Sequence, residues 1–476
     1  MSPRERVGAE RVPGFSAGVL GLLFSSCRLS IRNVRILERP PLGRRPGLAW
    51  AVGRRLGLSI SLVIAAQSPK ALEAAPAAGE AGTSKTLLFR VPPHARFVTP
   101  DSVAIAWETD EPSGGVAEYG LAGKWDQQVP YAAAQTAQQI TLSSLEPRAR
   151  YQYRIRANPV GREAAVSEAF EFDNALNYAV ARVPETGSPY PSDARSRQCI
   201  QAAEHILTAS GITRGYCLVL ECGEGQLAYE LAKRSELILL GVDGDADRVA
   251  RARALLTKAG VYGSRITLRH VDSLERLPCP DSFANLVVAD SASIPGRLPA
   301  SAAQIVSWLQ PATGVAILGP WPAASSAEAR NGIAQWLGDA KCNWDLVESP
   351  AGRWVRLRPE LPPDTGSWTH QYGDAGNTAN SQEGLQGVAA TDRLDVQWLG
   401  RPGADFGLDR NPRMPAPLAV NGRLFHQGLN RLVALDSYNG AVLWSAEIPA
   451  LRRVNMPRDC GNWCADREFV YAAVRD

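Results

Sequence analysis

Long apolar runs, basic runs interleaved with aromatic residues and a large net charge are all missing from this chain, and each absence removes a class of function. Charged residues make up 21% of the 476 positions, and the formal net charge is +3. No run of Lys or Arg is interleaved with aromatic residues, so nucleic acid is not an expected partner. The longest apolar runs near the N-terminus, 15–24 and 56–66, are shorter than the about 20 residues of a membrane-spanning helix. No transmembrane helix is therefore predicted.

Cysteine is also scarce, and its spacing is not that of a metal site. Among the eight cysteines, Cys460 and Cys464 lie close together without a further Cys or His pair, which is too little for zinc. They could form a local disulfide in an oxidising compartment, a quinoprotein-like feature, or two free thiols. Cys217 and Cys222 lie in and just after an apolar run, so we expect them in the core. The sequence predicts no metal site.

Residues 1–85 differ in composition from the rest and read as a leader. Residues 1–55 contain eleven arginines and no lysine. Both apolar runs are typical of signal-peptide cores, and the second fits better because a basic pair, Arg54-Arg55, precedes it and the Ala-rich stretch 71–81 follows it. This predicts a true start near Val52 and export to the periplasm or cell surface, with an envelope protein as a candidate partner. A disordered leader is the alternative, and a mis-annotated leader would leave the protein in the cytoplasm.

One local motif carries specific chemistry. The apolar run that begins at Leu218 leads into a glycine turn and then a helix pattern, and a second apolar run ends on Asp243. Gly223, Gly225 and Ala228 fit the dinucleotide fingerprint G-x-G-x-x-G/A, with an acid about 20 residues further on. That pattern alone favours NAD, bound at the carboxyl edge of a parallel sheet.

The charges in the turn argue against NAD. A pyrophosphate is bound by bare backbone N–H groups at the start of a helix, and this turn carries Glu221 and Glu224. Two carboxylates would repel a pyrophosphate, whereas they suit a cofactor with an ammonium and a sulfonium group.

Here the segment resembles the class I S-adenosylmethionine-dependent methyltransferases, whose first motif is an acid, any residue, Gly, any residue, Gly. Residues 221–225 read Glu-Cys-Gly-Glu-Gly. The later strands and helix of that fold match in order at 266–272, 283–290, 308–318, 344–347 and 353–358. The resemblance implies a Rossmann-like α/β domain over 190–360 that uses S-adenosyl-L-methionine. Gly223 and Gly225 would let the backbone approach this cofactor.

The resemblance also implies roles for four acids. Glu221 would face the methionyl ammonium, Asp243 the ribose hydroxyls and Asp272 the adenine amino group, while Asp290 would sit near the methyl-transfer edge. In the alternative interpretation, Asp243 and Asp272 only cap helices. Residues 289–293 lack the Asn/Asp-Pro-Pro-aromatic signature of the methyltransferases that act on bases and amides, so the acceptor is open. No catalytic residue is assigned, and His270 is expected to be structural.

Short alternating segments between about 86 and 175 predict an all-β domain. Residues 142–147, followed by Tyr151 and Tyr153, resemble fibronectin type III domains, including the one that precedes the catalytic domain of purple acid phosphatases. The resemblance implies a β-sandwich with Trp107 facing inward and Tyr151 as a corner tyrosine. Such domains act as spacers or adhesion modules.

The segment 365–476 follows a proline-rich joint and again predicts strands. Asn439-Gly440 between alternating residues indicates a hairpin with a type I′ turn. The phrase Ala-Leu-Asp, three residues, Gly and then Leu-Trp (434–444) resembles the repeat of quinoprotein-like β-propellers. Propellers need several blades, so the resemblance implies the truncated start of a propeller, with pyrroloquinoline quinone as a further candidate cofactor.

The sequence thus predicts a multidomain protein: a leader, a β-sandwich, a Rossmann-like methyltransferase domain and a partial β-propeller. The first functional hypothesis is S-adenosylmethionine-dependent methyl transfer to an unknown acceptor, with the β-domains serving localisation or recruitment. The alternative is a cell-envelope binding or scaffold protein built on the propeller, with a non-catalytic α/β domain.

Overall fold

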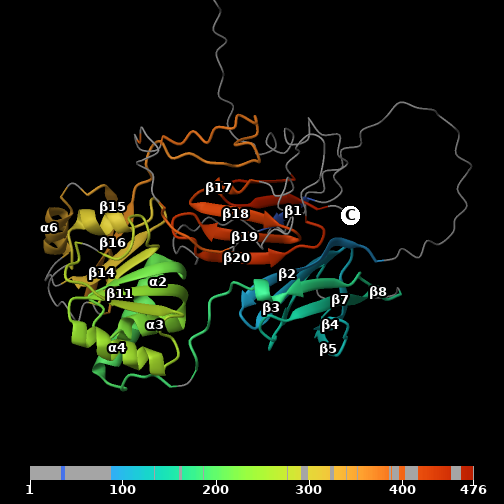
Figure 1. Cartoon of the computed structure of the whole chain (residues 1–476), viewed down its shortest axis with the longest axis horizontal. Helices are drawn as coiled ribbons and strands as arrows, with labels where there is room; N and C mark the ends of the chain where they lie inside the picture. The colour runs from blue at the N-terminus through green and yellow to red at the C-terminus, as the bar shows by residue number, and fades with distance from the viewer. Residues whose placement is uncertain are drawn as a thin grey trace, which may run out of the picture.

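The computed structural model describes residues 34–37 and 87–474, except 133–134, 160–162, 186, 276, 291–298, 322–325, 339, 351, 385–387, 389–395, 402–415 and 452–461. The predicted leader, apart from the short strand β1 (Val34–Leu37), and Cys460 therefore lie outside the described residues. An α/β domain lies at one end of the molecule and a group of β-strands at the other, with a further strand group beside both (Figure 1). None of the helices in the described part is long and apolar enough to cross a membrane.

The α/β domain is built on a seven-stranded sheet in the order β12-β11-β10-β13-β14-β16-β15. The first five strands of this order pair in parallel, and β16 runs antiparallel to both of its neighbours. The strands are β10 (Arg214–Leu220), β11 (Glu236–Asp243), β12 (Ile266–His270), β13 (Leu286–Ala289), β14 (Val315–Trp321), β15 (Cys342–Ser349) and β16 (Gly352–Pro359). The strands expected from the methyltransferase resemblance are thus present in the expected order.

Helices cover both faces of this sheet, and side chains that alternate along the strands pack beneath them. Cys217 and Val219 of β10 face one apolar cluster, whereas Leu218 and Leu220 face the other. Continuous burial on both faces is characteristic of a parallel sheet. The helices are α2 (Ala194–Ser210), α3 (Gln226–Arg234), α4 (Ala246–Lys258), α5 (Ala302–Trp308) and α6 (Ser326–Leu337). The first three contribute to one cluster and the last two to the other.

The strands between residues 89 and 173 form two antiparallel groups around one core. β2, β3 and β6 pair on one side, and β5, β4, β7 and β8 on the other, with β9 against β7. Their bounds are β2 (Phe89–Thr99), β3 (Ser102–Thr109), β4 (Ser113–Leu121), β5 (Gln127–Tyr131), β6 (Ala137–Leu142), β7 (Arg150–Pro159), β8 (Ala165–Val166) and β9 (Phe170–Asp173), followed by η1 (Asn174–Leu176). Trp107 faces inward at 2% exposure, and the Tyr151 hydroxyl accepts a hydrogen bond from the Glu146 N–H at 2.8 Å. Both side chains lie as expected, while the fibronectin type III assignment itself stays a prediction.

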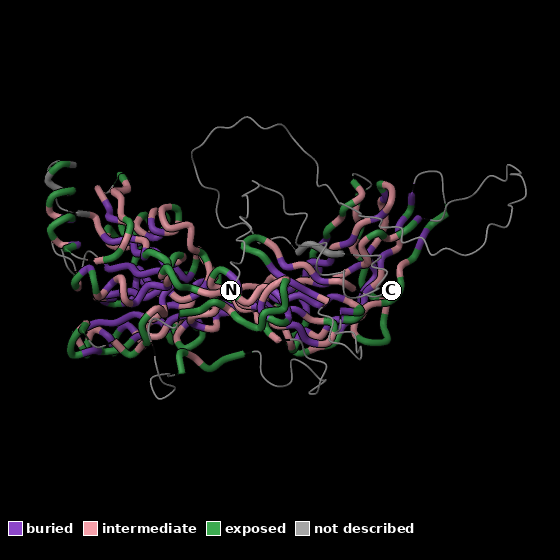
Figure 2. Tube along the Cα trace, turned by 90° about the horizontal axis from the view of Figure 1, so that it is seen from above, coloured by how far each residue is buried: buried purple, intermediate pink, exposed green. Residues whose placement is uncertain are grey.

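The C-terminal strands form a hairpin series that joins the preceding β-region. They are β17 (Leu418–Val420), β18 (Arg423–Gly428), β19 (Arg431–Asp436), β20 (Val442–Glu447), β21 (Trp463–Ala465) and β22 (Val470–Ala473), and β1 pairs with β22. β20 pairs with β2, so one sheet runs β17-β18-β19-β20-β2-β3-β6. Buried segments accordingly continue through this region (Figure 2). The propeller assignment stays a prediction.

The hairpin predicted at Asn439-Gly440 exists, but its turn is not type I′. A type I′ turn needs positive φ at both central residues; Gly440 has φ of +71°, whereas Asn439 is not in the positive region. Five residues, 437–441, separate the two strands, and the Gly440 N–H donates to the Asp436 carbonyl at 2.9 Å. A Cβ on Gly440 would lie 2.4 Å from Cε3 of Trp398, so glycine is required by this close approach as well as by φ.

That turn docks on the amino edge of the α/β sheet through a buried network of polar side chains, Asn285, Gln310, Asp436 and Asn439, called here the amide latch. Asp436 accepts hydrogen bonds from Asn285 Nδ2 at 2.8 Å and Gln310 Nε2 at 2.7 Å. Asn439 Nδ2 donates to Asn285 Oδ1 at 2.9 Å. Arg214, at the start of β10, donates to the carbonyl of Leu443 nearby. The α/β domain is therefore packed against the C-terminal strands, away from its own carboxyl edge.

Candidate active site at the carboxyl edge of the sheet

The loop from β10 to α3 bends through three residues of positive φ. These are Glu221 (+48°), Gly223 (+58°) and Gly225 (+79°). A Cβ on Gly225 would lie 3.1 Å from Leu256 Cδ1 and 3.4 Å from the Tyr190 hydroxyl oxygen, so glycine allows helix α3 to start tight against its neighbours. Positive φ is unfavourable for glutamate, and such conformations cluster at functional sites. The loop thus has a fixed, tightly bent backbone, and its first residue, Glu221, carries a carboxylate.

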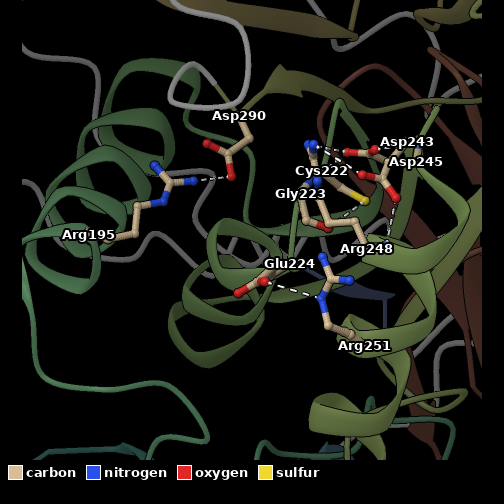
Figure 3. A network of polar contacts seen from close by, with 9 residues as sticks. All are labelled: Arg195, Cys222, Gly223, Glu224, Asp243, Asp245, Arg248, Arg251 and Asp290. Carbon is tan, nitrogen blue, oxygen red and sulfur yellow. Dashed lines mark hydrogen bonds and ion pairs between the residues drawn. The ribbon is translucent and has the colours of Figure 1, made fainter.

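Asp243 ties this loop to the end of the second strand. Its carboxylate is 1% exposed and accepts from the Gly223 N–H at 2.8 Å and from the Asp245 N–H at 2.9 Å. Arg248 Nη1 lies 3.6 Å from Asp243 Oδ2 (Figure 3). Asp243 does not cap the following helix, because the N-cap of α4 is Asp245, which accepts from the Arg248 N–H. The capping alternative is therefore wrong for Asp243.

Asp290 lies at the end of β13, next to the start of the loop. Its N–H donates to the Leu220 carbonyl at 3.0 Å, so the ends of β10 and β13 are adjacent. The side chain is 3% exposed and forms an ion pair with Arg195 Nη2 from helix α2 (Figure 3). Residues 291–293, from which the acceptor class was judged open, lie outside the described residues.

The other predicted site residues are more open to solvent. Glu221 is partly buried, whereas Asp272, two residues after β12, and His270, its last residue, are exposed. The Glu224 side chain is 55% exposed and lies 3.7 Å from Arg251 of α4. Its carbonyl accepts from the Tyr190 hydroxyl at 2.7 Å, and burial, the largest cause, raises the pKa of Tyr190 well above its ordinary value. The Glu224 carboxylate thus lies exposed beside Arg251, and its backbone carbonyl holds Tyr190.

Acids now stand at the ends of four adjacent strands: Glu221 after β10, Asp243 at β11, Asp272 after β12 and Asp290 after β13. Because the carboxyl ends of parallel strands meet at one edge of a sheet, these side chains share that edge. Two of them are neutralised locally by Arg248 and Arg195. The edge is thus a row of acids with arginines on its rim.

Three of the cysteines discussed from the sequence, Cys217, Cys222 and Cys464, behave as core residues. Cys217 and Cys222 are fully buried, and burial raises the pKa of both thiols far above the ordinary value. Cys464 is a buried free thiol whose pKa burial raises to about 12. Within the described residues, no group of three or more His, Cys, Asp or Glu side chains could hold a metal ion.

Sequence reasoning did not find the arginines or Tyr190. Arg248 follows Asp243 by five residues, a spacing that a helix starting at Asp245 could have indicated. Arg195 lies 95 residues before Asp290 and Tyr190 lies 34 before Glu224. No local signal connects residues so far apart.

Comparison with known proteins agrees with this geometry. Residues 218–312 match the family model of a methyltransferase domain. No curated protein sequence matches the chain significantly.

Solved structures that resemble the chain include three proteins described as methyltransferases. One, from Methanococcus maripaludis and described as S-adenosyl-L-methionine-dependent, is 18% identical, with 36% of this chain and 89% of that chain covered and a TM-score of 0.31. A SAM-dependent methyltransferase from Aquifex aeolicus is 16% identical (35% and 92% covered, TM-score 0.27). A geranyl diphosphate C-methyltransferase from Streptomyces coelicolor is 11% identical (38% and 90% covered, TM-score 0.25). Likeness at this level carries neither substrate nor activity over to this chain. What the family match shows is that the chain contains a methyltransferase domain, whose matched span includes the glycine loop, Asp243 and Asp290.

Proposed function

We propose that this protein transfers a methyl group from S-adenosyl-L-methionine to an acceptor at the carboxyl edge of the α/β sheet. The observation that carries the proposal is the row of acids, Glu221, Asp243, Asp272 and Asp290, at the ends of four adjacent strands within or beside the glycine loop. A cofactor with an ammonium and a sulfonium group complements such an edge, whereas a pyrophosphate would be repelled by it. The family match over 218–312 supports the same assignment.

The residues present fit this cofactor. Gly223 and Gly225 leave the loop backbone without side chains, and Glu221, at positive φ, is the candidate to face the methionyl ammonium. Each oxygen of Asp243 accepts one backbone N–H. A carboxylate oxygen can accept a second donor, and Asp243, whose side chain is 1% exposed here, is the candidate acceptor for the ribose hydroxyls. The exposed Asp272 is the candidate for the adenine amino group.

When bound, the cofactor supplies an electrophilic methyl group on a sulfonium. The chain's own contribution is to hold the acceptor nucleophile in line with that methyl, and positioning alone can supply a large part of a rate enhancement. Asp243 keeps the loop in shape by accepting the Gly223 N–H, and Asp290 is the candidate residue beside the methyl-transfer edge. No residue is assigned as a general base.

We assign localisation or acceptor recruitment to the flanking β-regions, as a fibronectin type III-like domain and the start of a propeller. Export to the envelope would suit both. The described residues offer no support for pyrroloquinoline quinone. The alternative, an envelope scaffold with an inert α/β domain, is favoured by one observation: β2 and β20 pair, so the two β-regions share a sheet that could act as a rigid support.

The first test is calorimetric titration of the full chain with S-adenosylmethionine, S-adenosylhomocysteine and NAD. We expect micromolar binding, about −8 kcal/mol, for the first two and none for NAD. Asp243→Ala should weaken it at least tenfold, because the loop loses its anchor and the ribose loses an acceptor. Asp247→Ala is the matched control: this acid lies four residues after Asp243, in the first turn of α4, and is exposed. A folded wild-type chain that binds neither sulfur compound would refute the proposal and favour the scaffold.

A further inference from the structure

Among the ion pairs at the carboxyl edge, Arg195 with Asp290 differs from the others in position. Arg248 and Arg251 both come from α4, beside β11, whereas Arg195 comes from α2 and lies on the β13 side of the glycine loop (Figure 3). The Asp290 side chain is 3% exposed, but that of Arg195 is 31% exposed. The pair therefore has a buried acid that orients a guanidinium still reached by solvent.

The guanidinium has donors to spare. Its Nη2 donates to Asp290 Oδ2, and among the described residues its side chain makes no other hydrogen bond. A guanidinium carries five N–H donors in a planar fork, so most of them are available to a ligand. Burial lowers the pKa of Arg195 and the Asp290 carboxylate raises it, with a net upward shift. The side chain stays charged at any physiological pH.

Within the described part of the chain, few other charges compete for the Arg195 guanidinium. Asp193 is the second acid near it, but that side chain accepts the Ser196 N–H as the N-cap of α2. The Cys199 thiol is kept neutral, since burial raises its pKa to about 12. On the other side of the loop, the exposed Asp272 and the partly buried Glu221 would repel an anion. An anionic ligand at this edge is thus directed toward Arg195.

We infer that Arg195 is a specificity-determining residue that binds an anionic group of the acceptor, a carboxylate or a phosphate. The planar fork of arginine matches both groups with paired hydrogen bonds. Asp290 acts as a positioning residue, because it fixes one amino group and leaves the others directed to the ligand. The assignment of this ligand as the methyl acceptor rests on the proposed function, whereas the anion site itself does not.

The test uses the folded full chain and three probes of similar shape: benzoate, phenyl phosphate and the neutral benzamide. Binding is measured by calorimetry and by ligand-observed NMR, with and without S-adenosylhomocysteine. We expect benzoate or phenyl phosphate to bind at least tenfold more tightly than benzamide. The affinities of the two anions, compared with each other, show whether the site prefers a carboxylate or a phosphate.

Variants of two arginines on the same helix make the test specific. Arg195→Met should weaken anion binding at least tenfold, and Arg195→Lys should restore part of it, since charge returns without the fork. Arg197→Met is the matched control, because Arg197 is an exposed residue on the same helix and lies two positions away. Thermal melting of each variant checks that the domain stays folded when the buried Asp290 loses its arginine partner.

The outcomes separate the two proposals. Benzamide binding as tightly as the anions, anion binding unchanged in Arg195→Met, or no binding of either anion would each overturn the inference. If S-adenosylhomocysteine gives no heat while anion binding still depends on Arg195, the cofactor proposal fails and the anion site stands. If S-adenosylhomocysteine binds and neither anion does, the cofactor proposal stands and only the proposed anion site is refuted.

Discussion

The two edges of the α/β sheet use polar residues in opposite ways. At the amino edge, the members of the amide latch are between 1% and 7% exposed, and they satisfy one another with neutral amide donors and one carboxylate. At the carboxyl edge, the arginines that meet the acids keep between 31% and 58% of their side chains exposed. One edge is closed by hydrogen bonds, and the other is lined with charges that solvent or a ligand can reach.

This difference follows from what each edge must do. A buried polar network is stable only when each member has its partner, and it then specifies one packing arrangement. Charges that must exchange partners cannot be buried in this way, because an unpaired buried charge is costly. The same strand serves both ends: Asn285 precedes β13 and Asp290 follows it. The sheet is thus anchored at its amino edge and available for binding at its carboxyl edge.

The largest effect is expected from Asp436→Ala in the amide latch. The change removes the acceptor for Asn285 Nδ2 and Gln310 Nε2, which stay buried. Leaving a buried donor unsatisfied costs about 1–3 kcal/mol, so we expect a loss of about 3 kcal/mol in the free energy of unfolding, measured with urea. We also expect the α/β domain to unfold separately from the C-terminal strands. Asp247→Ala is the control, and we expect its free energy of unfolding to stay within about 0.5 kcal/mol of wild type. A similarly small change for Asp436→Ala would show that the amide latch does not couple the α/β domain to the C-terminal strands.

A smaller loss is expected from Gly440→Ala in the turn that carries the latch. Alanine at a φ of +71° costs about 1 kcal/mol, and its Cβ would meet Trp398 at 2.4 Å. Gly123→Ala separates the two causes, because Gly123 has φ of +88° but no atom within 4 Å of the added Cβ. We expect a loss of about 2 kcal/mol at Gly440 and about 1 kcal/mol at Gly123, both from urea unfolding. Equal losses would mean that the tryptophan moves aside freely.

Much of the α/β fold could be read from the sequence because its signals are local. Apolar strands, the glycine turn and strand-end acids recur in a fixed order, and all of the strands predicted from them are present. The burial of Asp243 against the glycine loop could not be predicted from the sequence. Its contact with the Gly223 N–H depends on how β10 and β11 pair. Arg195 was missed for the same reason, since its partner Asp290 is distant in sequence.

The β-regions show where local reasoning was insufficient. The hairpin at 431–447 was predicted, but its turn type was wrong because Asn439 is engaged by the α/β domain. Its Nδ2 donates to the Phe283 carbonyl at 2.8 Å as well as to Asn285. The pairing of β2 with β20 joins Ala95 to Glu447 across most of the chain. Turn propensity describes an isolated hairpin, and here tertiary packing determines the turn.

The smallest effect is expected from Arg251→Gln at the carboxyl edge, and it tests the open character of that edge. Arg251 and Glu224 are 58% and 55% exposed with their charged atoms 3.7 Å apart. Exposed pairs of this kind contribute about 0–1 kcal/mol because solvent and salt screen them. We expect less than about 0.5 kcal/mol in urea, and less again at high salt. A loss above about 1 kcal/mol, insensitive to salt, would mean that the pair is shielded from water. The carboxyl edge would then be closed like the amino edge, and its acids would serve the fold more than a ligand.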